Sequence, residues 1–318
     1  MRRLVKWGVL ILTLTANPAV DGNYTVDRLV FEDRAYILAR SEAPGGRGIN
    51  ASSVLHSFGA PTAAIVPSGG KSGVKFEQLL AGCGFPVHVV RIKNDVRRNL
   101  TISDRSGLTI KLNELGPPMS KRELERLEAM VREKLKEASW LLLCGSLPPS
   151  VPPTFYSRLI SLAREQGVKT LLDTDGDPLR EGVEAHPTVV CPNQQEAERL
   201  LNRALITRMH FIEAVDRIRQ MGPESVVLSL GSRGAIAARA DLMVEVIPPR
   251  VEAVCPIGAG DALVAAFAWA MTQKSDFADA VRWGVAAGTA SSRLPGVAFA
   301  SLSETKEIYE RVEIRRLA

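Results

Sequence analysis

The sequence is poor in several features that mark common classes of protein. Only 5% of its 318 residues are aromatic, and no basic run is interleaved with aromatic residues, so a nucleic-acid partner is not expected. No apolar stretch is long enough to cross a bilayer, so a membrane partner is not expected either. The four cysteines form no C-x-x-C pair, and no histidine stands at ligand spacing from them. We therefore expect free thiols rather than a zinc site.

The remaining composition is that of an ordinary soluble enzyme. The chain is 46% hydrophobic and 24% charged, with a net charge of +5 that suits phosphorylated metabolites. Residues 1–19 have the outline of a signal peptide, with basic residues, an apolar run and small residues. However, Lys6 interrupts the run, and VLILTLT has the β-branched content of a buried strand. We predict a first strand there and a cytoplasmic location.

Apolar segments alternate with helical patterns in the second half of the chain. The predicted strands are WLLLCGS, VKTLLDTDG, PTVVCPN and SVVLSLG, and helical patterns lie between them. This alternation is typical of a parallel sheet that helices cover on both faces. Because no linker, low-complexity run or internal repeat divides the sequence, we predict a single α/β domain over residues 1–318.

Two earlier regions do not fit this alternation. Residues 24–43 form short extended segments of mixed polarity, and residues 97–113 form a hairpin pattern around the turn sequence DRSG. We predict that roughly 22–43 and 95–114 form a small β-sheet lid on the α/β domain. An exposed lid strand would favour a homodimer through edge pairing.

Polar and glycine residues collect where the predicted strands end, which is where parallel sheets bind ligands. They are Asp21, Gly145, Ser146, Asp173, Asp175, Asn193, Ser229, Gly231 and the GAGD turn after the apolar segment EAVCPI. Turns and helix caps use the same residue types, so no single position is decisive.

The turn Gly258-Ala259-Gly260-Asp261 precedes an almost wholly apolar helical segment, ALVAAFAWAM. The two glycines allow backbone N–H groups to converge on an anion at a helix N-terminus. Asp261 would repel a phosphate there, so it is either an N-cap or a general base beside a phosphoryl group. These residues alone favour the N-cap.

Three other groups of residues have two interpretations each. The loop 45–48, of sequence GGRG, is either a backbone cradle for a ligand or a flexible loop, and it matches neither the P-loop nor the dinucleotide pattern. Arg97 and Arg98 either grip a phosphate or are merely solvated. Asn193 and Glu196 share a first helical turn, where they either hold water around Mg²⁺ or cap the helix.

The motifs together resemble the ribokinase-like carbohydrate kinases, and more narrowly the phosphofructokinase B branch. That branch includes 1-phosphofructokinase, tagatose-6-phosphate kinase and the minor 6-phosphofructokinase type. The motifs that carry the resemblance occur in the family's order and are TLT-NPAVD (13–21), GGRGIN (45–50), GSLP (145–148), PNQQE (192–196), SLG (229–231) and GAGD (258–261). The resemblance implies a three-layer α/β fold with a mainly parallel sheet and a β-sheet lid that often pairs two subunits.

The resemblance also implies ATP as co-substrate, Mg²⁺ as cofactor and a ketohexose phosphate as acceptor. Asp261 would act as the base, and Gly258, Ala259 and Gly260 would form an anion hole. The implied substrate residues are Asp21, Gly45, Gly46, Arg47, Asn50, Arg97 and, from the lid, Arg34. The implied nucleotide residues are Asn193, Ser229, Gly231 and Gly234, with Glu196 holding Mg²⁺ through water.

Two departures from the family pattern concern the nucleotide. Cys191 stands where relatives usually have lysine, and Pro256 stands where they usually have threonine. Pro256 removes an N–H group and a hydroxyl, so weaker ATP binding is expected. The alternatives are a kinase of an unphosphorylated sugar or nucleoside, and a non-catalytic sugar-phosphate-binding regulator. The phosphorylated carbon and the identity of the sugar remain open.

Overall fold

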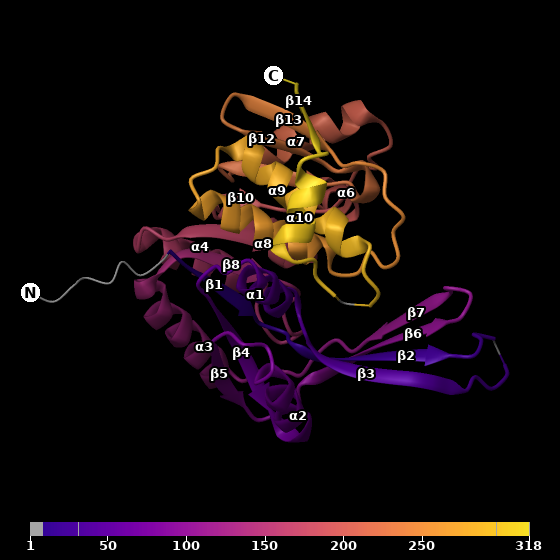
Figure 1. The fold of residues 1–318 in the computed structure, drawn as a ribbon. Helices are drawn as coiled ribbons and strands as arrows, with labels where there is room; N and C mark the ends of the chain where they lie inside the picture. The colour runs from indigo at the N-terminus through magenta and orange to yellow at the C-terminus, as the bar shows by residue number, and fades with distance from the viewer. Residues whose placement is uncertain (1–8, 31, 297, 318) are drawn as a thin grey trace, which may run out of the picture.

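The computed structural model describes residues 9–30, 32–296 and 298–317. It has a large sheet covered by helices on both faces and a separate small sheet that projects from the main body (Figure 1). The predicted first strand is confirmed, because β1 (Leu10–Thr15) lies inside the large sheet between two parallel neighbours. Residues 1–8, which belong to the signal-peptide alternative, lie outside the described residues.

The large sheet is mainly parallel, as predicted. Within the described residues it has ten strands, in the order β14-β13-β12-β11-β10-β9-β8-β1-β4-β5. Every pairing from β11 to β5 is parallel. The bounds of these strands are β4 Thr62–Gly69, β5 Val87–Ile92, β8 Ala138–Cys144, β9 Lys169–Asp173, β10 Val189–Val190 and β11 Ser225–Ser229.

The other edge of this sheet is antiparallel and was not predicted. It consists of β12 (Ala235–Arg239), β13 (Leu242–Ile247) and β14 (Glu313–Arg316). The expectation that EAVCPI is a strand leading into the GAGD turn is wrong, since residues 252–257 belong to no strand. Both edges of β13 are already paired, and residues 251, 253 and 256 line a pocket instead.

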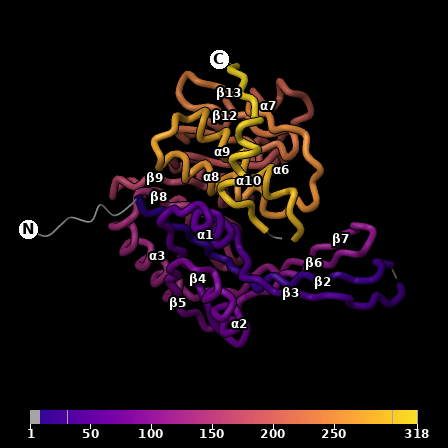
Figure 2. Tube along the Cα trace, in the orientation of Figure 1, coloured from indigo at the N-terminus to yellow at the C-terminus, as the bar shows by residue number. Residues whose placement is uncertain are grey.

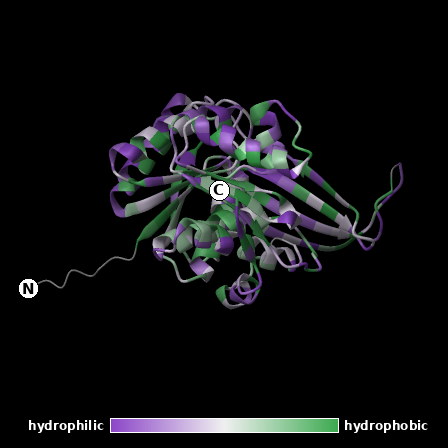
Figure 3. Ribbon diagram, turned by 90° about the horizontal axis from the view of Figure 1, so that it is seen from above, coloured by the Kyte–Doolittle hydropathy of each residue, from purple (hydrophilic) through white to green (hydrophobic). Residues whose placement is uncertain are grey.

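Helices cover the two faces of the large sheet because its side chains alternate between them. Leu12 and Leu14 pack on one face and Ile11 on the other. The helices of the first face are α3 Lys121–Lys134, α4 Phe155–Glu165, α5 Gly176–Glu184, α6 Gln194–Leu201 and α7 Arg208–Gln220. Those of the second face are α1 Arg47–Ser57, α2 Gly70–Leu80, α8 Ala259–Thr272, α9 Phe277–Ser292 and α10 Leu302–Tyr309. Hydrophobic residues gather between these layers (Figure 3).

Local sequence signals account for several helix starts. The S-x-x-E pattern of Ser120 and Glu123 forms a capping box at the start of α3, where each residue's side chain meets the other's backbone N–H. α10 begins with a second capping box, at Ser301 and Glu304. Short 3₁₀ turns, η1 (Leu135–Glu137) and η2 (Gly231–Arg233), complete the helical elements.

The small sheet has the strand order β3-β2-β6-β7. Its bounds are β2 Ala19–Val26, β3 Ile37–Gly45, β6 Arg97–Asp104 and β7 Thr109–Asn113. β6 and β7 form the predicted hairpin around the DRSG turn, and β2 pairs antiparallel with β3 and parallel with β6. The near ends of β2, β3 and β6 join the main body, and the far ends extend away from it (Figure 2). One end of this sheet therefore lies at the carboxyl edge of β1.

Candidate active site

The GAGD turn forms the start of α8. Gly258 is the cap residue, with a left-handed φ of 82°, and it has no side chain to cap with. Asp261 is already the third residue of the helix, and its Oδ2 accepts a hydrogen bond from Asn50 Nδ2 at 2.7 Å. The N-cap interpretation of Asp261 is therefore wrong. A Cβ at Gly260 would meet no atom within 4 Å, so the helix start is open on that side, where helix N-termini favour anions. The Ala259 N–H donates to the Pro256 carbonyl oxygen at 3.3 Å.

Asp261 has the electrostatic environment of a general base. Its side chain is buried, and this burial, followed by the nearby Asp173 carboxylate, raises its pKa to about 7. The hydrogen bond from Asn50 and the charge of Arg47 act in the opposite direction. A carboxylate with a pKa near neutrality can accept a proton from a hydroxyl group and release it again.

Asp21 lies at the junction between the small sheet and α1. Asn99 Nδ2 donates to Asp21 Oδ1 at 2.8 Å, and burial raises the pKa of the Asp21 carboxyl group. A Cβ at Gly45 would stand only 2.2 Å from Asp21 Cγ, so glycine is required for this approach. Gly46, with a φ of 131°, is the residue from which α1 begins. The structure thus brings the predicted residues Asp21, Gly45, Gly46 and Asn50 to one side of Asp261.

Arg97 lies beside Asp21, and its charge acts to lower the pKa of that carboxyl group. Its Nε donates to the carbonyl oxygen of Asn17 at 3.1 Å, and its Nη1 donates to that of Glu114 at 2.9 Å. Burial lowers the pKa of Arg97. These contacts hold the guanidinium in place near the junction of the two sheets.

Arg47 occupies a different environment from the one expected of a substrate-phosphate ligand. Its Nη1 lies 3.0 Å from Asp173 Oδ1, and its Nη2 lies 3.4 Å from Asp175 Oδ2 and 3.1 Å from Glu196 Oε1. Asp173 above all raises the pKa of Arg47. We call Arg47 with these three carboxylates the carboxylate cluster.

Asn193 and Glu196 form a capping box at the start of α6. Asn193 Oδ1 accepts from Glu196 N at 3.0 Å, and Glu196 Oε2 accepts from Asn193 N at 2.9 Å. Both side chains also line a cavity of about 140 Å³ together with Arg47, Asp173 and Asp261. Burial raises the pKa of Glu196 to about 7, with Asp173 the next cause. Asn193 and Glu196 therefore cap α6 and also line the cavity beside Asp261.

A larger pocket of about 480 Å³ adjoins this cavity, and both are lined by Ser229 and Gly260. Gly231, Gly234 and Pro256 also line the larger pocket. Gly234 has a φ of 89°, and a Cβ there would stand 2.0 Å from the carbonyl oxygen of Val246. The predicted nucleotide residues thus surround two connected spaces beside the start of α8.

One predicted residue lies apart from the others. Arg34 is exposed in the connection between β2 and β3. Figure 1 shows the ends of β2 and β3 that flank this connection at the far end of the small sheet. Among the residues that the structure describes, Arg34 forms hydrogen bonds or ion pairs with none of the other predicted site residues. The structure does not bring it to Asp261 within one chain.

Three residues of the site were not predicted as ligands. Asp173 and Asp175 were noted at a strand end, which was the available signal, but neither was assigned a role. Asn99 gave no signal, because it lies within a hairpin strand. Within the described part of the chain, Asn99 Oδ1 is buried without a hydrogen-bond partner, while its Nδ2 donates to Asp21.

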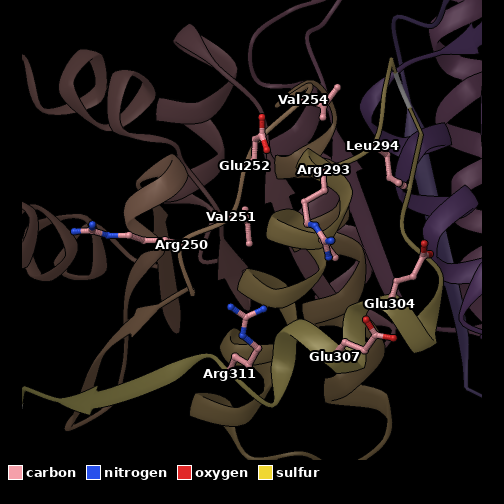
Figure 4. A pocket seen from close by; sticks show the side chains of 10 residues that line it. Arg250, Val251, Glu252, Val254, Arg293, Leu294, Glu304, Glu307 and Arg311 are labelled. Atoms are coloured by element: carbon pink, nitrogen blue, oxygen red, sulfur yellow. The ribbon is translucent and has the colours of Figure 1, made fainter.

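Another pocket, of about 530 Å³, lies beside the 480 Å³ pocket, and Arg250 and Val251 line both. Arg293 and Arg311 point toward its centre (Figure 4). Three glutamates also line it, so the charges of its arginines are offset, and none of the predicted site residues belongs to it. We therefore place the candidate active site at the start of α8.

Comparison with known proteins decides the family. The model for the pfkB family carbohydrate kinases matches residues 10–305. The chain belongs to this family. ATP-dependent 6-phosphofructokinase isozyme 2 of Escherichia coli (strain K12) is 32% identical over 304 residues, which cover 95% of this chain and 98% of the relative. The 1-phosphofructokinase of Borreliella burgdorferi is 31% identical, with 89% of this chain and 92% of the relative covered.

Solved structures agree with this assignment. The phosphofructokinase-2 from Escherichia coli in complex with fructose-6-phosphate has a TM-score of 0.88 at 32% identity, covering 95% of this chain and 99% of that one. Arabidopsis thaliana ribokinase complexed with ribose and ATP has a TM-score of 0.74 at 21% identity, covering 95% and 99%, which shows the common fold. This pfkB family kinase is therefore an ATP-dependent phosphotransferase with the predicted ribokinase-like fold. Its described helices include none with the length and apolar character needed to cross a membrane.

Proposed function

We propose that this kinase transfers the γ-phosphate of ATP to a hydroxyl group of a ketohexose phosphate, giving a bisphosphate and ADP. The main support is Asp261, a buried carboxylate with a pKa of about 7 beside the backbone N–H groups of a helix start. Relatives in the family are named for 6-phosphofructokinase, 1-phosphofructokinase and tagatose-6-phosphate kinase activity. The sugar and the carbon that is phosphorylated are open among these three.

The proposed chemical step is in-line phosphoryl transfer. The acceptor oxygen forms a bond to the γ-phosphorus while the bond to the β–γ bridging oxygen breaks, and ADP leaves with that oxygen. Asp261 takes the proton of the acceptor hydroxyl group. The N–H groups of Gly258, Ala259 and Gly260 stabilise the charge that develops on the phosphoryl oxygens.

The sugar is proposed to lie between Asp21 and Asp261. Asp21 and Asn50 would bind sugar hydroxyl groups against the Gly45-Gly46 backbone, where a side chain would block the approach. Arg97 would meet the substrate's phosphate with Nη2, since Nε and Nη1 already bond to backbone carbonyls. Arg34 would reach the substrate's phosphate only from the small sheet of a second subunit, or after a movement of the small sheet that carries it.

The nucleotide is proposed to occupy the 480 Å³ pocket, with Asn193, Ser229, Gly231 and Gly234 around it. Cys191 and Pro256 line the two connected spaces, where they would weaken nucleotide binding relative to lysine and threonine.

Mg²⁺ is proposed as the cofactor, held through water by Glu196. Among the described residues, no three His, Cys, Asp or Glu side chains are grouped to hold a metal by themselves. Nucleotide-dependent Mg²⁺ sites need only one or two carboxylates besides phosphate and water, and buried Glu196 and Asp173 supply those. When bound, Mg²⁺ would neutralise charge on the β- and γ-phosphates.

The assembly is proposed to be a cytoplasmic homodimer of single-domain subunits paired through the small sheet. The apolar residues Ile37 and Leu38 in β3, Tyr36 just before it and Leu112 in β7 are all about half exposed or more. Edge strands with such residues are suited to pairing with a second copy. The small sheet would then act as the predicted lid, contributed by roughly 22–43 and 95–114.

A substrate panel tests this proposal. Purified protein with Mg·ATP should phosphorylate at least one of fructose 6-phosphate, fructose 1-phosphate and tagatose 6-phosphate, measured by coupled ADP release. Its kcat/KM for that sugar phosphate should exceed the value for free fructose, because only the phosphate can engage Arg97. A preference for free fructose would favour the unphosphorylated-sugar alternative. Absence of turnover with all of them would refute the proposed activity.

A further inference from the structure

The carboxylate cluster joins four separate elements through one side chain. Arg47 comes from the start of α1, Asp173 from the end of β9, Asp175 from the cap of α5, and Glu196 from the first turn of α6. The three ion pairs measure 3.0, 3.4 and 3.1 Å and use both terminal nitrogens of the guanidinium. The side chains of Asp173 and Glu196 are 9% and 4% exposed, so water contributes little to their solvation.

The charges in this cluster do not balance. One guanidinium faces three carboxylates, and the Asp261 carboxylate is near enough to interact with Arg47 as well. Carboxylate oxygens are the protein ligands that hard divalent cations prefer. The same side chains, except Asp175, line the 140 Å³ cavity. A divalent cation and the guanidinium of Arg47 therefore have the same oxygen partners.

We propose that Arg47 keeps divalent metal out of the carboxylate cluster until nucleotide binds. Phosphate oxygens of the arriving nucleotide can engage a guanidinium in bidentate fashion, which draws Arg47 away from the carboxylates. Glu196 and Asp173 are then released for the metal. This makes metal entry depend on nucleotide and makes Arg47 a positioning residue. The inference rests on the proposed kinase function, since it concerns the metal that accompanies ATP.

A purely structural role for Arg47 makes a different prediction. If the ion pairs only tie α1 to α5 and α6, their removal lowers stability without creating a metal site. If Arg47 competes with metal, removal of its charge leaves carboxylates that bind metal without nucleotide. Metal binding by the nucleotide-free protein therefore separates the two roles.

The experiment titrates nucleotide-free protein with Mn²⁺ and follows the free ion by electron paramagnetic resonance. Arg47→Met keeps an unbranched apolar chain without the charge, and it should bind Mn²⁺ roughly tenfold or more tightly than the wild type. Adding Glu196→Gln to Arg47→Met should remove the gain. Arg208→Met is the matched control, because it breaks an exposed pair with Glu245 away from the site and should leave Mn²⁺ binding unchanged.

Equal Mn²⁺ affinity in folded Arg47→Met and wild-type protein would overturn the inference. Circular dichroism checks folding, and Arg47→Lys serves if the methionine variant does not fold. A single ammonium group cannot span three carboxylates as a guanidinium does, so Arg47→Lys should also bind Mn²⁺ more tightly than the wild type. If a folded Arg47→Lys variant binds Mn²⁺ only as tightly as the wild type, that result would likewise count against the inference. No sugar or turnover enters this measurement, so a failure of the proposed kinase activity is scored separately.

Discussion

At the scale of single residues, the position of Asp261 within α8 determines which groups its carboxylate contacts. An aspartate at the cap would bond to backbone N–H groups and have a low pKa. Two features place Asp261 differently: it is the third residue of α8, and Asn50 is its hydrogen-bond donor. Its carboxylate is thus held by a side chain from α1 and does not occupy the N–H groups of the turn, of which the Ala259 N–H donates to the Pro256 carbonyl oxygen at 3.3 Å. Burial raises its pKa toward the range of a useful base.

Asp261→Asn tests the base directly. The amide keeps the size of the side chain but cannot accept the hydroxyl proton, so kcat should fall by about 10²–10⁴-fold. Binding of the sugar phosphate, measured by isothermal titration calorimetry, should change little. Unchanged kcat in this variant would exclude Asp261 as the base.

The pH dependence of kcat/KM follows from the raised pKa values. The proposed base, Asp261, can accept a proton only when it is deprotonated, so activity should be present above a pH of about 7 and fall below it. Glu196 also has a pKa raised to about 7, so its protonation would steepen the same acidic limb. An unperturbed aspartate would keep activity down to about pH 4. A profile that stays flat from pH 8 to pH 5 would contradict the raised pKa.

At the scale of elements, the junction between β3 and α1 controls how closely Asp21 can approach. Gly45→Ala would place a Cβ 2.2 Å from Asp21 Cγ, so the carboxylate must move. Because a displacement of about 1 Å can cost roughly 10²-fold, kcat/KM for the sugar should fall by about that factor. Gly82→Ala is the control, since its Cβ would meet only Leu79 O at 3.4 Å. Equal losses in both variants would argue against a specific role for Gly45.

Helices and strands that are marked by residues close together in the sequence, such as caps and turns, could be predicted. Elements that depend on distant neighbours could not. The capping-box residues Ser120 and Glu123 are only three positions apart, and the β6–β7 hairpin is encoded by its turn. By contrast, EAVCPI has the apolar composition of a strand, yet residues 252–257 join no strand, and the preceding strand β13 is already flanked by β12 and β14. Whether an apolar segment pairs in a sheet depends on neighbours that composition does not reveal.

The same distinction holds within the site. Asn193 and Glu196 were recognisable because they are three residues apart on one helical turn. The partners of Arg47 are 126 to 149 residues away in the sequence, and only the fold brings them together. The family resemblance identified Arg47 as a site residue, whereas its ion pairs with carboxylates follow from the packing of α1 against the carboxyl edge of the sheet.

At the scale of the whole molecule, the small sheet is open at its outer strands. β3 and β7 are the edges, and Ile37 and Leu112 on them are 60% and 52% exposed. Apolar side chains on unpaired edges tend to be covered by another chain. In the proposed dimer, the β2–β3 connection of one copy, which carries Arg34, would lie toward its partner's main body.

Sedimentation velocity tests this arrangement. The wild type should sediment as a dimer, and Ile37→Glu should shift it toward monomer, because a charge would be buried at the interface. Ile206→Glu is the matched control, since Ile206 is 76% exposed but lies in the main body between α6 and α7. A wild-type monomer, or a dimer that Ile37→Glu and Leu112→Glu both leave intact, would exclude pairing through the small sheet. If the wild type is a dimer, Ile37→Glu should also raise KM for the sugar phosphate, and by more than Ile206→Glu does. The reason is that separating the subunits would remove Arg34 from its position over the partner's site.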